Sequence, residues 1–79
     1  IPIHDDLKIR NYSVYLDKNE NISSVEIYCS TDKDGNKIIE WYKEKLNSTN
    51  DAKGVWNNFE MDVSFNKFSN LVSIVLKKQ

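Results

Sequence analysis

The sequence predicts an α+β fold in which two strands, one helix and two further strands follow one another, a β-β-α-β-β order. Three observations lead to this prediction. The segment 31–46 repeats apolar residues with the period of a helix. Strand-like runs with alternating apolar residues lie on both sides of it, and a short polar turn joins the two runs of each pair. We therefore expect a four-stranded antiparallel sheet with one helix packed on one face.

The central helix is expected within the segment TDKDGNKIIEWYKEKL. On a helical wheel one arc collects Gly35, Ile38, Ile39, Tyr42 and Leu46. An apolar stripe about 100° wide is typical of a helix that lies on a sheet. Trp41 lies off this stripe beside Lys45, so we expect its ring to cover the rim of the contact. The side chains that can accept backbone N–H groups at the helix start belong to Thr31, Asp32 and Asp34.

The strands are expected at about 8–16, 22–30, 55–65 and 71–77, with turns at 17–21 and 66–70. The first three strands alternate apolar and polar residues, which predicts one buried face, whereas the last strand is apolar on both faces. The apolar residues of that face are Tyr12, Val14 and Leu16, then Val25, Ile27 and Cys29, then Phe59, Met61, Val63 and Phe65, and finally Val72, Ile74 and Leu76.

Length and composition limit the class of protein. A chain of 79 residues makes one domain, here 1–79. Charged residues make up 29% and the net charge is −1, so the chain lacks the basic excess of a nucleic-acid module. The one cysteine allows no intrachain disulfide, and no apolar run is long enough to cross a membrane. Because the chain opens at Ile1 rather than Met, we expect a removed leader, anchor or neighbouring domain.

The second face of the expected sheet is the candidate partner-binding surface. Its outward apolar residues are Tyr15, Tyr28, Leu71 and Val75, among acidic residues. If they cluster, they form the kind of apolar patch that marks a contact surface, and otherwise the face is simply solvated. Trp56 is out of phase with the inward residues of its strand, so we add it to this set. Its alternative role is to close the edge of a small core.

No residues form a convincing catalytic or metal site. Asp32 to Asn36 is similar to part of a calcium loop, but Trp41 stands where the bidentate glutamate is needed, so a helix cap is the favoured interpretation. His4 with Asp5 and Asp6 lacks a second histidine for zinc. Two glycines provide no phosphate-binding loop. We therefore expect no enzyme, no metal and no cofactor.

Two stretches resemble a recurrent small domain of uncharacterised bacterial envelope lipoproteins and secreted proteins. They are the opening IPIHDDLKI and the helix TDKDGNKIIEWYKEKL. The matching positions are Ile1, Pro2, Lys8 and Ile9, then Thr31, Asp32, Lys33, Ile38, Trp41, Tyr42, Lys43 and Leu46. The resemblance implies an extracytoplasmic location and an anchored neighbour or lipid, and it supplies no catalytic residues.

Three functions follow as hypotheses. The first is a non-catalytic module of a bacterial envelope or secreted protein, which binds a protein partner or neighbouring domain through the open sheet face. Such a module touches the membrane only through a removed anchor and binds no nucleic acid. The second is a small cytosolic regulator or inhibitor that forms a homodimer through the same face. The third is a ligand or metal binder that uses Asp32 and Asp34 at the helix start.

Overall fold

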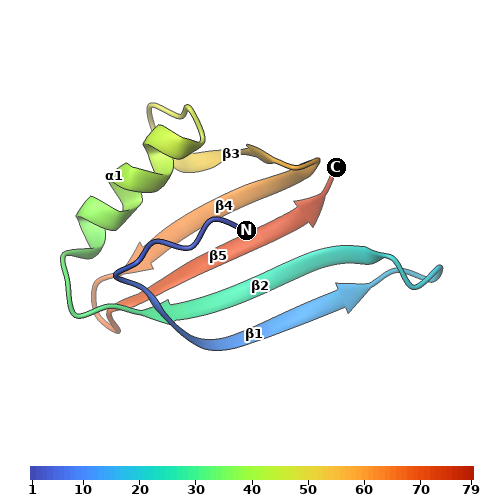
Figure 1. Ribbon diagram of the computed structural model, residues 1–79, viewed down its shortest axis with the longest axis horizontal. Coiled ribbons are helices and arrows are strands. Elements are labelled where there is room, and N and C mark those ends of the chain that lie inside the picture. The colour runs from blue at the N-terminus through green and yellow to red at the C-terminus, as the bar shows by residue number, and fades with distance from the viewer.

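The computed structural model describes all 79 residues and shows an α+β fold with one helix and an open antiparallel sheet (Figure 1). The elements in chain order are β1 (Lys8–Leu16), β2 (Ile22–Ser30), α1 (Gly35–Lys45), β3 (Ala52–Trp56), β4 (Phe59–Asn66) and β5 (Leu71–Lys78). The predicted fold class is confirmed. The predicted strand count is wrong, because the sheet has five strands and the element order is β-β-α-β-β-β.

The additional strand arises where a single strand was expected at 55–65. Asn57 and Asn58 have φ angles of 51° and 71°, in the left-handed region. Two successive residues of that kind make the tight turn that suits a twisted hairpin, and asparagine adopts the conformation more readily than most residues. The chain therefore reverses between Trp56 and Phe59, which face each other across the β3–β4 pair.

The strands are ordered β1-β2-β5-β4-β3, so the last strand in sequence is the centre of the sheet (Figure 1). Each neighbouring pair is antiparallel. Ile74 of β5 lies between Ile27 of β2 and Val63 of β4, and none of the three is more than 6% exposed. The hydrophobic core is built around this central strand. Its buried members are Ile27, Cys29, Ile38, Tyr42, Ala52, Met61, Val63, Val72, Ile74 and Leu76.

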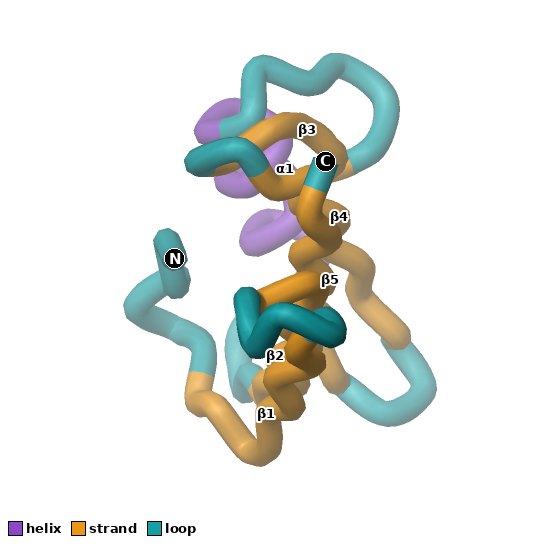
Figure 2. Tube along the Cα trace, turned by 90° about the vertical axis from the view of Figure 1, so that its right-hand side faces the viewer, coloured by secondary structure: helices purple, strands orange, loops and turns teal.

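Helix α1 begins at Gly35, inside the expected segment, and Asp34, one of the three side chains expected at the helix start, is its N-cap. The Asp34 carboxylate accepts the backbone N–H of Asn36 at 3.0 Å. Ile38 and Tyr42 are buried against the sheet, as the helical wheel predicts. The helix packs over β3 and β4 at one side of the sheet (Figures 1 and 2). With 11 residues, it is too short to span a bilayer, and the chain has no other helix.

The N-terminal segment, residues 1–7, runs beside the helix on the same side of the sheet (Figure 2). Ile3 and Leu7 pack against the core. The Tyr42 hydroxyl donates to the Pro2 carbonyl at 2.8 Å and accepts the His4 backbone N–H at 3.2 Å. The helix and this segment both lie on one face of the sheet, which we call the helix side, and they leave the opposite face open.

Candidate binding surface

Four of the five residues predicted to bind a partner share the open face, as expected from their alternation. Tyr28 of β2 lies opposite Ser73 of β5, so Leu71 and Val75 are its diagonal neighbours. These three side chains form a small cluster, and all are half-buried. Tyr15 of β1 stands apart from them.

Polar groups surround this open-face cluster. The Tyr15 hydroxyl donates to the Glu26 carboxylate at 3.0 Å, and Glu26 lies directly opposite Val75. The hydrogen bond and the negative charge of Glu26 raise the pKa of Tyr15 above its usual value. On the other side of Val75 lies Asp62 of β4, whose carboxylate is 3.9 Å from the ammonium group of Lys53. The open face therefore has a small, half-buried apolar centre with charged residues on both sides of Val75.

Trp56 lies on the helix side, opposite to the face assumed from the sequence. It is half-buried and packs against the core. The reason is the turn at Asn57 and Asn58, which places Trp56 on a separate strand whose inward residues are Ala52, Gly54 and Trp56. Of the two roles considered for Trp56, the structure places it where it closes the core edge. The second tryptophan, Trp41, lies at the helix rim with the Lys45 ammonium 5.2 Å from its ring centre.

A different apolar surface, on the helix side of β1, is more exposed than the open-face cluster. Side chains on this side of β1 lie opposite the core residues of β2, since Ile9 pairs with Cys29 and Tyr12 with Ile27. They are nevertheless open to solvent: 49% for Ile9, 65% for Tyr12, 46% for Val14 and 56% for Leu16. We call these four residues the β1 stripe.

Ile22 extends the β1 stripe at its far end, because it lies opposite Leu16 and is 46% exposed. Nine large apolar side chains are exposed in the whole chain, and six of them belong to β1 and β2. Five of those six are the β1 stripe and Ile22. Scattered exposed apolar residues are ordinary, but a contiguous row on one face indicates a contact surface.

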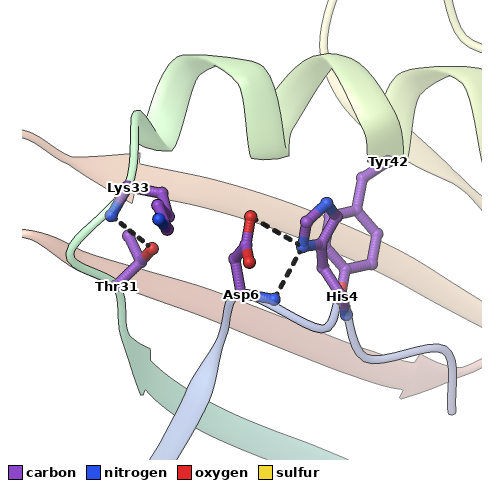
Figure 3. Close-up of polar contacts among 5 residues, drawn as sticks. All are labelled: His4, Asp6, Thr31, Lys33 and Tyr42. Atoms are coloured by element: carbon purple, nitrogen blue, oxygen red, sulfur yellow. Dashed lines mark hydrogen bonds and ion pairs between the residues drawn. The ribbon is translucent and has the colours of Figure 1, made fainter.

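The β1 stripe is exposed because both covering elements stop short of it. The helix lies over β3 and β4, at the far edge of the sheet. The N-terminal segment is held close to the helix by Tyr42 (Figure 3). The His4 and Trp41 rings pack edge-on with their centroids 4.9 Å apart. The Nδ1 atom of His4 accepts the Asp6 backbone N–H at 3.0 Å. These contacts hold the segment beside the helix rather than over β1.

The residues considered for chemistry have structural roles. His4 and Asp6 order the N-terminal segment, and Asp34 caps the helix. Cys29 is fully buried, and burial raises the pKa of its thiol. A reactive cysteine needs the opposite shift, toward the thiolate, so this environment favours a core role for Cys29.

Alternation predicts the correct face for Tyr12, Val14 and Leu16 but predicts that this face is buried. Ile9 joins them because the pairing register shifts between Ile9 and Asn11, which simple alternation does not predict. The signal for exposure lies in the strand order, which depends on pairings between distant segments. One local signal was available. Tyr12 and Tyr15 have polar hydroxyl groups and stand in a strand whose polar positions carry Arg10, Asn11 and Ser13, a composition that suits an edge. Comparisons with protein-family models, curated proteins and solved structures gave no match to this chain.

Proposed function

We propose that this domain is a non-catalytic binding module that docks a protein surface on the β1 stripe. The observation that supports it most strongly is the concentration of exposed apolar side chains on one hairpin, six of the nine in the chain. Aromatic and aliphatic side chains that are already open to water need no rearrangement before they are buried by a partner. The open-face cluster around Tyr28 is the alternative binding surface, and it serves as the control in the experiment that tests the proposal.

Site-specific photocrosslinking tests this proposal. Photoreactive p-benzoylphenylalanine replaces Tyr12 in one variant and Tyr28 in a matched control, and both are irradiated in the cells that make the protein. Tyr12 is 65% exposed and Tyr28 is half-buried on the other face, so the two report on different surfaces. We expect a discrete, higher-mass adduct from position 12 and none from position 28. An adduct from position 28 alone would move the binding site to the open face, and no adduct at position 12 would overturn the proposal.

We further propose that the module works outside the cytoplasm, in the cell envelope or as part of a secreted protein. This proposal is supported by the resemblance carried by the opening segment and the helix. A fusion of the full-length coding sequence to a reporter that is active only after export would test it. Export of the reporter supports the envelope location, and retention in the cytoplasm supports the alternative of a small cytosolic regulator.

A further inference from the structure

We propose that the partner docked on β1 is a second copy of this chain, paired antiparallel through β1 across a two-fold axis. The inference rests on the proposed function and names its partner. Two five-stranded sheets would then join edge to edge into one sheet of ten strands. A contact of this kind is isologous, so one strand must complement itself in shape, polarity and charge.

The backbone of β1 is available for such pairing, except that the Tyr12 N–H already donates to Asn11 Oδ1 at 2.9 Å. β1 is an edge strand with a neighbour on one side only, and it is nine residues long. Proteins usually protect long edges with proline, charged side chains or covering loops. Residues 11–16 of β1, NYSVYL, contain neither proline nor a charged side chain. The edge therefore presents six uncharged residues, a length typical of a paired strand.

The side chains of β1 complement themselves in one register. In an antiparallel pair related by a two-fold axis at Val14, Tyr12 of each copy lies opposite Leu16 of the other, and the two Val14 side chains meet at the axis. Directly opposite residues in antiparallel strands point to the same face and contact one another. The β1 stripes of the two copies would then form one apolar row on the helix side. On the open face, Ser13 of each copy would lie opposite Tyr15.

The charges at the two ends of β1 also match in an antiparallel dimer. The strand begins with Lys8 and Arg10, and the turn after it carries Asp17 and Glu20 together with Lys18. An antiparallel partner brings the basic start of one β1 beside the acidic turn of the other. A parallel partner would place like charges together at both ends.

The other edge of the sheet is a weaker candidate for this contact. β3 has only five residues and includes Gly54, a residue that weakens strands. Its exposed large apolar side chain is Val55, which is 58% exposed on the open face. Since the helix lies over the inner side of β3, no exposed apolar row accompanies this edge.

Sedimentation velocity over a wide range of protein concentrations gives the first test. We expect the wild type to convert from monomer to dimer as concentration rises, and Val14→Lys to raise the dimer dissociation constant at least about tenfold, because two ammonium groups would meet at the axis. Val55→Lys is the matched control, since it puts the same charge at a similarly exposed valine on the other edge strand. Circular dichroism melts verify that both variants fold. A wild type that stays monomeric at every concentration would overturn the inference.

A charge exchange tests the antiparallel arrangement itself. Lys8→Glu gives a copy with acidic residues at positions 8 and 20, and Glu20→Lys gives one with basic residues at both positions. Each variant alone should dimerise roughly threefold to tenfold more weakly, because position 8 of each copy then lies near a like charge at position 20 of the other. An equimolar mixture should recover the wild-type affinity as a heterodimer, because both of these pairs become oppositely charged again. A mixture that dimerises no better than its separate components would contradict this geometry.

The outcomes also separate this inference from the proposed function. A dimer joined by crosslinks from position 12 supports both. A crosslink from position 12 to a different protein, together with a monomeric wild type, retains the binding module and overturns the homodimer.

Discussion

Gly35 occupies the first helical position of α1 because a larger residue does not fit there. A Cβ atom built on Gly35 would clash with the ring of Phe65 on β4. Glycine is otherwise a poor helix former, and at this position it lets the start of the helix approach the sheet closely. From the sequence alone Gly35 is only an irregularity in the helix, because the constraint comes from a residue on β4.

We predict that Gly35→Ala destabilises the domain by about 1–3 kcal/mol, the cost typical of overpacking a core. In an unconstrained helix the same substitution would stabilise by about 1 kcal/mol, so the sign of the effect is diagnostic. Asn36→Ala is the matched control, since Asn36 is exposed at the next position. Urea unfolding gives both values. Stabilisation by Gly35→Ala would show that α1 does not pack on Phe65 as described.

Tyr42 joins the helix to the N-terminal segment through a single hydroxyl group. Its ring is fully buried, and its hydroxyl both donates to Pro2 and accepts from His4. We expect Tyr42→Phe to lower the free energy of unfolding by about 1–3 kcal/mol, since the substitution leaves those two backbone groups without this partner. It should also speed hydrogen exchange at the His4 amide. An unchanged exchange rate at that amide would mean that the segment is held by its apolar contacts alone.

The same hydroxyl makes stability depend on alkaline pH. Burial raises the pKa of Tyr42 above the usual tyrosine value of about 10. Because the folded-state pKa is the higher one, the contribution to stability is complete below about pH 10 and is lost as pH rises from there through the folded-state pKa. Unfolding free energy measured between pH 8 and pH 11 should therefore fall more steeply for the wild type than for Tyr42→Phe. Parallel profiles would contradict this assignment.

At the scale of secondary structure, local sequence predicts β1, β2 and β5 well but merges β3 with β4. The merged prediction followed the alternation of Phe59, Met61, Val63 and Phe65, a strong local signal that β4 fulfils. Asn58 stands at a polar position of the same alternation, so the pattern extends the predicted strand through the turn at Asn57 and Asn58. Two adjacent asparagines between apolar runs are a turn signal, and giving them that weight would have produced both strands and the inward position of Trp56.

The β3–β4 turn leads to a prediction at a single position. Asn58 has a φ angle of 71°, which most residues with a Cβ avoid. We expect Asn58→Ala to destabilise by about 1 kcal/mol, and Asn58→Gly to be neutral or stabilising because glycine adopts this conformation freely. Thermal melts of the two variants measure the difference. Equal stabilities would argue against the left-handed geometry of this turn.

At the scale of the whole molecule, the core lies off centre. The molecule measures 40 × 26 × 20 Å, and the buried residues gather beneath α1 and the N-terminal segment, whereas β1 contributes none. Alternation predicted which way Tyr12, Val14 and Leu16 point, but whether they are covered depends on where the helix lies. That position follows from the β2–β5 pairing, which joins distant segments and has no local signature.

The off-centre core predicts unequal effects for similar truncations. Ile74→Ala, in the fully buried centre of β5, should cost about 2–5 kcal/mol. Leu16→Ala, at a position 56% exposed, should change the stability of the monomer by less than about 0.5 kcal/mol. Chemical denaturation at dilute, monomeric concentrations compares them. A large effect of Leu16→Ala under those conditions would mean that the monomer itself covers the β1 stripe.

The central place of β5 has a consequence for synthesis on the ribosome. The β1–β2 hairpin and the α1–β3–β4 unit both precede β5 in the chain. In the sheet they are joined only through β5, which pairs with β2 on one side and with β4 on the other. Until β5 leaves the ribosome, the two parts of the sheet are not hydrogen-bonded to each other, and the edges of β2 and β4 that will pair with β5 remain unpaired. We expect the cooperative closure of the domain to await that last strand, and chaperones that shield unpaired edges to act on the chain during the interval.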